Sequence, residues 1–165
     1  MRKSITTRYF YSTAVLLLCS IAVMGFIQMY LSIGYFRTEN DESLLNTVDN
    51  IIRVLNDVNI NDAVEGRTKA VSRGIEIAAR VSGSQIYVTD TSGAIILCSA
   101  VEPEKYLGCV LPRKALAAAD AAGVYTELGT MGGFFESRYY VAGKPLTLGG
   151  QPGGYVFAAL DAQNL

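Results

Sequence analysis

The chain has 165 residues, half of them hydrophobic, and a formal net charge of −1 from 14 basic and 15 acidic side chains. This length suits one ordinary domain with an appendage. The absence of a basic stripe argues against a nucleic-acid partner. Three cysteines with no histidine do not make up a usual set of zinc ligands, so we expect no metal site.

The first predicted element is an apolar helix near the N-terminus. Residues 14–34, AVLLLCSIAVMGFIQMYLSIG, carry no charge. As a helix they would reach about 30 Å, the thickness of a bilayer core. Aromatic residues cluster within 9–11 and 30–36, where rings suit headgroup depth. We predict an uncleaved transmembrane signal anchor over 13–36; a cleaved signal peptide, normally shorter, is the alternative.

Charge predicts the orientation of this helix. Arg2, Lys3 and Arg8 precede the apolar segment. Basic residues stay on the cytoplasmic side of a membrane helix. We therefore expect residues 1–12 to be cytoplasmic and residues 37–165 to form an extracytoplasmic domain, on a chain that crosses the cell membrane once and contacts membrane lipid.

A long helix is predicted to follow, from Thr38 to Asn61. Its apolar residues recur in steps of four and three: Leu44, Val48, Ile51, Leu55 and Val58. This spacing places them on one helical stripe. The stripe packs either against the sheet of its own domain or against a second copy in a homodimer, where a regular stripe suits a coiled seam, and both can hold along different stretches.

The remaining predicted elements are short and follow one another closely. They are a helix over 67–82, strands over 85–89 and 94–99, a helix over 112–123, and strands over 124–128, 134–141 and 154–160, with turns at 142–145 and 149–154. Strands grouped around antiparallel turns, with most helices at one end of the chain, predict an α+β fold. We expect an antiparallel sheet of about five strands with helices packed on one face.

The turn between the first two strands, Asp90-Thr91-Ser92-Gly93, is similar to the catalytic loop of aspartic proteases but has one residue too many. Asp90 is instead expected to accept backbone hydrogen bonds, with Gly93 adopting the unusual dihedrals. Serine and cysteine have no histidine partner anywhere. The sequence therefore predicts no catalytic site and no cofactor in this chain.

Cys98 and Cys109 lie in the predicted outer domain, whereas Cys19 lies in the apolar segment and is expected to be a small apolar residue. An even number of cysteines in an oxidising compartment predicts a disulfide between Cys98 and Cys109. The alternative is two unpaired small core residues.

These features together resemble the N-terminal input region of bacterial membrane-bound sensor histidine kinases, with an extracytoplasmic PAS-like domain of the Cache or PDC type. The likeness rests on MRKSITTR, the apolar segment, the long helix from Thr38, IYVTDTSGAIILCS, YLGCVLP, and FFESRYYVAGKPL with GGYVFAAL. In that family V-x-D-x-x-G-x-I marks the first hairpin of the sensor sheet. It is a structural signature there.

The resemblance implies a signal-sensing domain that relays a stimulus through its helices to a kinase half and a cytoplasmic response regulator. Family members continue into a second span and a histidine-bearing kinase, so we expect this chain to be a fragment of a longer histidine kinase. The alternative is a membrane-anchored interaction or structural module without signalling output.

One ligand site is predicted from strand alternation. If Tyr87, Arg138 and Tyr140 converge, they form a pocket with aromatic walls and one cation. Such a pocket would suit a small carboxylate, as in many Cache domains, because a guanidinium binds a carboxylate through two hydrogen bonds. The alternative is a solvated face on which Arg138 pairs with Glu136 or Glu127.

Overall fold

The structure is a computed structural model that describes residues 5–57 and 65–163. It divides into two compact units, Met1–Glu39 and Asn40–Leu165, each of which is described by itself. The predicted end of the long helix near Asn61, and Val58 of its stripe, lie outside the described residues.

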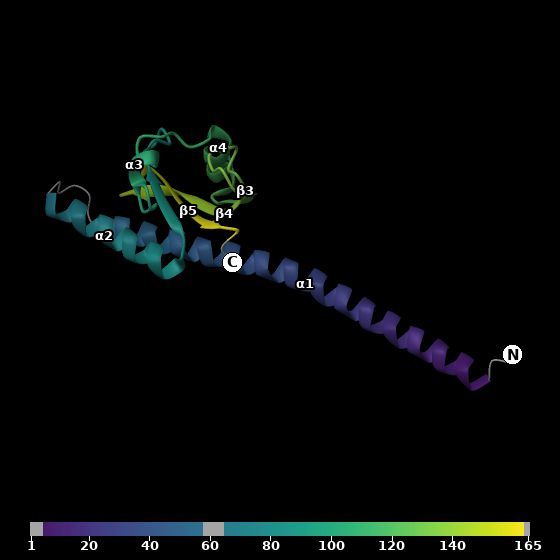
Figure 1. Ribbon diagram of the computed structural model, residues 1–165. Coiled ribbons are helices and arrows are strands. Elements are labelled where there is room, and N and C mark those ends of the chain that lie inside the picture. Colours follow the sequence, from purple (N-terminus) through teal and green to yellow (C-terminus); the bar gives the residue numbers. More distant parts are fainter. Residues whose placement is uncertain (1–4, 58–64, 164–165) are drawn as a thin grey trace. The chain divides into compact units, whose positions relative to one another are not determined.

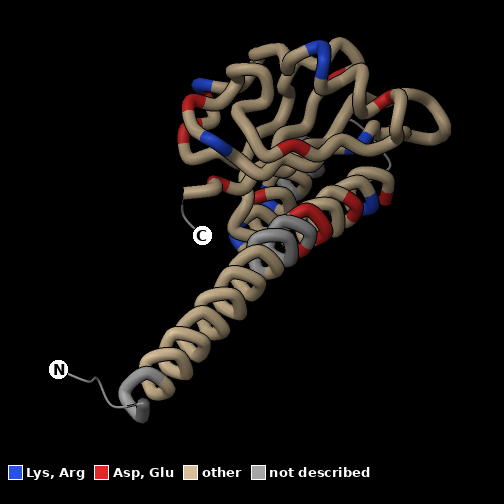
Figure 2. The backbone as a smooth tube through the Cα atoms, turned by 90° about the vertical axis from the view of Figure 1, so that its right-hand side faces the viewer, with Lys and Arg blue, Asp and Glu red and all other residues tan. Residues whose placement is uncertain are grey.

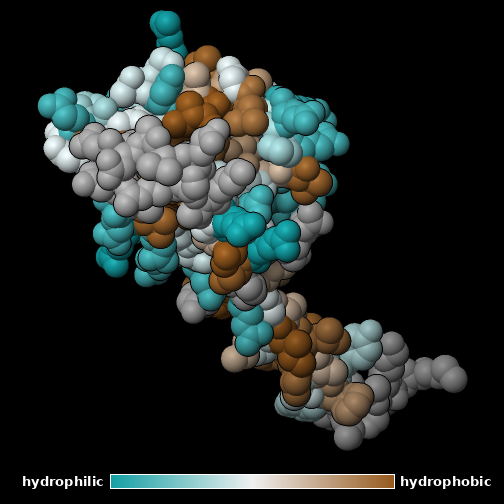
Figure 3. All heavy atoms as spheres, turned by 90° about the vertical axis from the view of Figure 1, so that its left-hand side faces the viewer, coloured by the Kyte–Doolittle hydropathy of each residue, from teal (hydrophilic) through white to brown (hydrophobic). Residues whose placement is uncertain are grey.

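The first unit is helical and apolar. It belongs to helix α1, which runs over Ile5–Asp57. Within α1, Tyr9–Leu31 is 23 residues long with a mean hydropathy of 2.2, and none of it is buried. Figure 2 shows no charged residue along this segment, and Figure 3 shows hydrophobic side chains on its surface. By length and composition this helix is able to cross a membrane, as predicted, although its apolar window begins earlier than residue 13.

The second unit is built on a five-stranded antiparallel sheet (Figure 1). The strands are β1 (Gln85–Thr89), β2 (Ile95–Cys98), β3 (Tyr125–Gly129), β4 (Tyr139–Leu148) and β5 (Gln151–Asp161). Their order in the sheet is β2-β1-β5-β4-β3, so the last strand lies at the centre beside the first. The predicted α+β class with about five antiparallel strands is confirmed.

One face of the sheet is covered by two long helices, the part of α1 from Asn40 onward and α2 (Glu65–Ser82). Leu44, Val48, Ile51 and Leu55 of α1 are at most 5% exposed, in one core with Ile75 of α2 and with sheet residues. The predicted stripe thus packs against the sheet of its own domain, and burial of its side chains stabilises that arrangement. These four residues are not free to form a seam with a second copy.

The opposite face is covered as well, by two shorter helices and a loop segment that the expectation of helices packed on one face did not include. The covering elements are α3 (Pro103–Tyr106), α4 (Arg113–Ala122) and the segment 130–138. The core on this face contains Tyr87, Ile95, Ala100, Leu111, Ala115, Leu116, Met131, Phe135, Val141, Phe157 and Ala159. Burying both faces requires apolar residues at successive strand positions, a pattern that alternation alone does not reveal.

Strand β4 differs from the prediction, which placed a strand over 134–141 and a turn over 142–145. The strand runs straight through Gly143 and Pro145, and the turn follows at Gly149-Gly150, both with positive φ. A side chain at Gly143 would overlap the Phe157 ring. Pairing of β4 with β3 ends at Gly143, so Pro145 lies where β4 has a free edge and its missing N–H leaves no β3 carbonyl unpaired.

The β1–β2 turn is formed as predicted. Asp90 Oδ1 accepts hydrogen bonds from the backbone N–H of Ser92 at 2.8 Å and of Ala94 at 2.9 Å. It also accepts one from the Ser92 hydroxyl at 2.7 Å. Gly93 has φ +86°. These hydrogen bonds hold the pKa of Asp90 below its usual value, and the one from the Ser92 hydroxyl has the largest effect.

Candidate functional site

The residues predicted to form a carboxylate pocket do not converge. Tyr87 is buried in the core beneath α3 and α4, whereas Tyr140 packs against the core beneath α1 and α2. The two tyrosines therefore lie on opposite faces of the sheet. Arg138 is exposed just before β4, and Glu136, one of its predicted partners, pairs with Lys105 at 3.0 Å.

Tyr87 is instead the centre of an aromatic cluster with Tyr106, Phe134, Phe135 and Tyr139. Neighbouring rings have centroids 4.4 to 6.0 Å apart, mostly in edge-on or tilted contact. Such pairs add about 0.5–1.5 kcal/mol each beyond area burial. With Tyr87 only 1% exposed, this cluster is a packed core in the structure.

The buried phenol of Tyr87 donates a hydrogen bond to Gln85 Oε1 at 2.6 Å. Burial raises the pKa of Tyr87 far above its ordinary value, and the neighbouring Cys98, Tyr106 and Tyr139 raise it further. Gln85 also forms a hydrogen bond with Tyr139.

The two outer cysteines are free in the structure, so the predicted disulfide is not formed there. The Cys109 carbonyl accepts a hydrogen bond from the N–H of Ile95, three residues before Cys98 along β2. This register offsets the two thiols along the strand. Cys98 is half-buried, and burial raises the pKa of its thiol, whereas Cys109 is exposed and donates to the Lys105 carbonyl.

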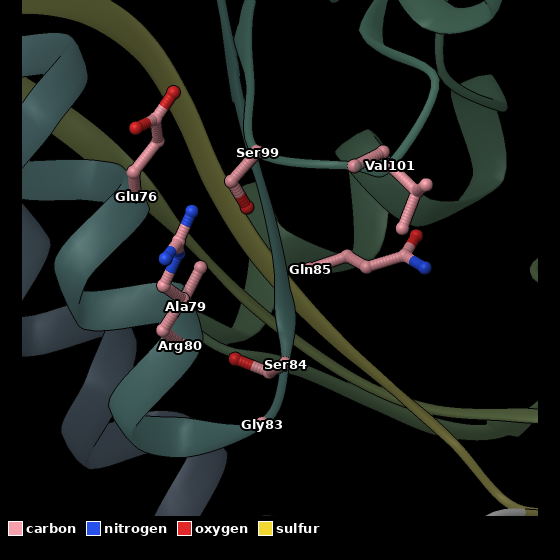
Figure 4. A pocket seen from close by; sticks show the side chains of 9 residues that line it. Glu76, Ala79, Arg80, Gly83, Ser84, Gln85, Ser99 and Val101 are labelled. Carbon is pink, nitrogen blue, oxygen red and sulfur yellow. The ribbon is translucent and has the colours of Figure 1, made fainter.

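A groove of about 480 Å³ lies between the C-terminal half of α2 and the ends of β1 and β2 (Figure 4). It is lined by Glu76, Ala79, Arg80, Gly83, Ser84, Gln85, Ser99, Ala100 and Val101. The helix supplies the two charged groups, and the strand ends supply two hydroxyls and one amide. Its volume falls within the range of about 300–1,000 Å³ found for small-molecule sites.

The backbone fixes the wall of the groove next to the sheet. Ser99 Oγ accepts the backbone N–H of Ile86 at 2.7 Å, and the Ser99 N–H donates to the Ile86 carbonyl at 3.0 Å. The N–H of Ser84 donates to the Ala79 carbonyl at 3.1 Å, which joins β1 directly to the end of α2. Gly83, with φ +65°, allows this sharp reversal.

Sequence reasoning missed this groove. Glu76 and Arg80 stand one turn apart on the predicted helix over 67–82, and serines flank the first two strands at 84 and 99. Those spacings are a weak signal by themselves, because nothing in them indicates that the helix end meets both strand ends. Across the described part of the chain, no group of three or more potential metal ligands is present.

No protein-family description matches the chain, and no curated protein is similar in sequence. Solved structures are similar in fold. The Escherichia coli DcuS sensor domain matches with a TM-score of 0.55 and 14% identity, over 78% of this chain and 92% of that domain. The sensory domain of the Campylobacter jejuni chemoreceptor Tlp3 matches with a TM-score of 0.54 and 11% identity, over 80% of this chain and 56% of that one.

A third similar structure is the ligand-binding domain of the Pseudomonas aeruginosa amino-acid chemoreceptor PctC in complex with GABA. It matches with a TM-score of 0.51 and 17% identity, over 78% of this chain and 60% of that one. The chain thus spans nearly all of the DcuS domain but little more than half of the two chemoreceptor domains. It has the fold of bacterial sensor domains, the PAS-like fold that the sequence resemblance implied.

Proposed function

We propose that this chain is the signal-sensing input region of a membrane receptor, with residues 37–165 outside the cell, 13–36 as the anchor and 1–12 in the cytoplasm. The observation that carries the proposal is the fold shared with the DcuS sensor domain, which the chain covers to 92%. The apolar segment Tyr9–Leu31 supports it, because a receptor must be held in the membrane.

The receptor in this proposal is a two-component sensor histidine kinase, whose kinase half would act on a cytoplasmic response regulator. The kinase assignment rests on the sequence resemblance, since the same fold occurs in the chemoreceptors Tlp3 and PctC. The helix α1 is continuous over Ile5–Asp57. A ligand-induced shift of about 1–2 Å in its buried part would be passed along the helix toward the membrane.

The stimulus in this proposal is a small molecule with a carboxylate group. Tlp3 has been solved with isoleucine and PctC with GABA. A ligand acts by binding one arrangement of the domain more tightly than another, so its differential affinity sets the size of the response.

The proposal is tested by thermal unfolding of the full chain in lipid nanodiscs with a panel of amino acids and short mono- and dicarboxylates. A sensing domain gains stability from a ligand in proportion to RT ln(1 + [L]/Kd), about 2.7 kcal/mol at 100 times Kd. We expect at least one compound to raise the unfolding midpoint with a saturating dose dependence. A membrane-anchored interaction module predicts no shift with any compound.

A further inference from the structure

We propose that the groove between α2 and the ends of β1 and β2 binds a small zwitterion, a molecule that carries one carboxylate and one ammonium group. This inference rests on the proposed sensing function and names its ligand class and its site. The guanidinium of Arg80 would bind the carboxylate, and the carboxylate of Glu76 would bind the ammonium group.

The first argument is that the groove holds two opposite charges that are not used by the fold. Glu76 and Arg80 are both exposed, and neither takes part in an ion pair or hydrogen bond within the described part of the chain. Residues four apart on a helix are close enough to pair with each other. Here they do not, so both charges remain available to a ligand that spans them.

The second argument is the complementary chemistry of the opposite wall (Figure 4). Because Ser99 Oγ already accepts the N–H of Ile86, its own O–H proton is free to donate. Ser84 is 5% exposed, and its hydroxyl shares a 2.6 Å hydrogen bond with that of Ser82. A fixed hydroxyl donor facing a guanidinium favours a carboxylate, whose oxygens accept from both.

The third argument is the apolar surface between the polar groups. Ala79, Ala100 and Val101 line the groove, and Val101 is 94% exposed. The methylene groups of an amino acid would cover part of this surface, at about 25 cal/mol per Å² removed from water. The groove therefore fits a short chain with charged ends better than an inorganic anion.

Binding at this site would act on the long helices. Ala79 and Ile75 of α2 are buried in the same core as Val48 and Ile51 of α1. A ligand that bridges α2 to the end of β2 would draw α2 toward the sheet edge. That displacement would reach α1 through the shared core, because close-packed interiors transmit strain.

The inference is tested by titration calorimetry of the full chain in nanodiscs. The probes are the ω-amino acids glycine, 3-aminopropanoate, 4-aminobutanoate and 5-aminopentanoate, with propanoate and propylamine as analogues that have only one charge. We expect one or two adjacent chain lengths to bind, and both one-charge analogues to bind at least about tenfold more weakly, equivalent to 1.4 kcal/mol.

Two variants locate the site, and a third is the control. Arg80→Gln and Glu76→Gln should each lower the affinity for the probe that binds the wild type most tightly by at least about tenfold. Arg73→Gln removes an exposed arginine from the same helix outside the groove and should leave affinity unchanged. All three positions are exposed, so the unfolding midpoint without ligand should stay close to that of the wild type.

Two results would overturn the inference. One is that the wild-type chain binds no member of the series. The other is that Arg80→Gln or Glu76→Gln lowers the affinity for that probe less than threefold. If another compound raises the unfolding midpoint equally in the wild type and in Arg80→Gln, the sensing function stands and the groove is not its site.

Discussion

The buried phenol of Tyr87 makes stability depend on alkaline pH. Its pKa is raised above the ordinary value of 10.0, chiefly by burial, so the folded chain keeps the proton that the unfolded chain releases. A raised pKa of this kind leaves stability intact below pH 10 and reduces it as the pH rises further. The pKa of Tyr125 is raised in the same direction, first by burial and then by Glu127, so its titration adds to the effect.

We predict that in Tyr87→Phe the free energy of unfolding falls less steeply between about pH 10 and pH 11.5 than in the wild type, because the variant has no phenol to ionise at this position. The measurement is chemical unfolding of the wild type and the variant at pH 8 and across that range. The lost hydrogen bond to Gln85 lowers the variant's stability equally at every pH, so only the slope is diagnostic. Identical slopes would show that Tyr87 does not titrate with unfolding.

Gly143 marks a position where a side chain does not fit. A Cβ there would overlap the ring of Phe157, which lies across from it in the β4–β5 pair. We predict that Gly143→Ala lowers the free energy of unfolding by about 1–3 kcal/mol, the usual cost of overpacking a core. Urea unfolding of the full chain in nanodiscs measures it.

The matched control is Gly74→Ala in α2. Its Cβ would lie 3.9 Å from Val54 Cγ1, an ordinary contact, in a helix that alanine favours. We expect a gain of about 0.5–1 kcal/mol. Losses of similar size in the two variants would contradict the contact that we describe between Gly143 and Phe157.

At the scale of elements, a polar contact between Asp49 and Lys144 joins the α1 helix to the sheet, in addition to its apolar stripe. Lys144 Nζ of β4 lies 2.7 and 2.8 Å from the two carboxylate oxygens of Asp49. The two side chains are 26% and 42% exposed. Because water screens a pair this accessible, its net contribution is modest.

We predict that Lys144→Met lowers the free energy of unfolding by up to about 1 kcal/mol at low salt and by less in 1 M salt. The control is Lys105→Met, which removes the more exposed pair with Glu136 and should cost less. Urea unfolding at the two salt concentrations compares them. An equal loss in both variants, unaffected by salt, would mean that the Asp49 contact does not stabilise α1 on the sheet.

Much of this arrangement was predictable from local patterns. The stripe at Leu44, Val48 and Ile51 predicted the buried face of α1, and Asp90 with Gly93 predicted the first turn. The end of β4 was not predictable, because Gly143 and Pro145 favour turns locally. In the fold, Gly143 lies where the Phe157 ring leaves no room for a side chain, and Pro145 lies where β4 has a free edge.

The candidate site was less predictable than the fold. Tyr87 and Tyr140 were expected to face one pocket. Which residues of different strands share a face of the sheet depends on the register between β1, β5 and β4, and the sequence of a single strand does not determine that register. The groove at Glu76 and Arg80 depends on where α2 ends against the sheet. Such contacts between distant segments are set by packing, and sequence spacing does not reveal them.

At the scale of the whole molecule, the proposed topology predicts the reactivity of cysteines in intact cells. Cys109 is exposed, and burial raises the pKa of Cys98, so Cys109 should react with a membrane-impermeant maleimide before Cys98 does. We predict labelling of Cys109 without permeabilisation in a chain that carries Cys19→Ser and Cys98→Ser.

The control for topology is Ser4→Cys in a chain without the other cysteines, which should be labelled only after the membrane is permeabilised. The reverse pattern, with Ser4→Cys labelled first, would place the domain in the cytoplasm. Equal labelling of both positions in intact cells would indicate that the reagent had crossed the membrane and would call for a larger maleimide.

The measurement that tests the central claim most directly is phosphorylation of a chimeric receptor. Residues 1–165 are joined through a second membrane helix to the cytoplasmic half of a histidine kinase, and autophosphorylation is measured with and without a compound that raises the unfolding midpoint. We predict a severalfold change in the steady-state level, half-complete near the Kd of that compound. Unchanged phosphorylation at concentrations that saturate the domain would contradict the claim that this chain senses its ligand for an output across the membrane.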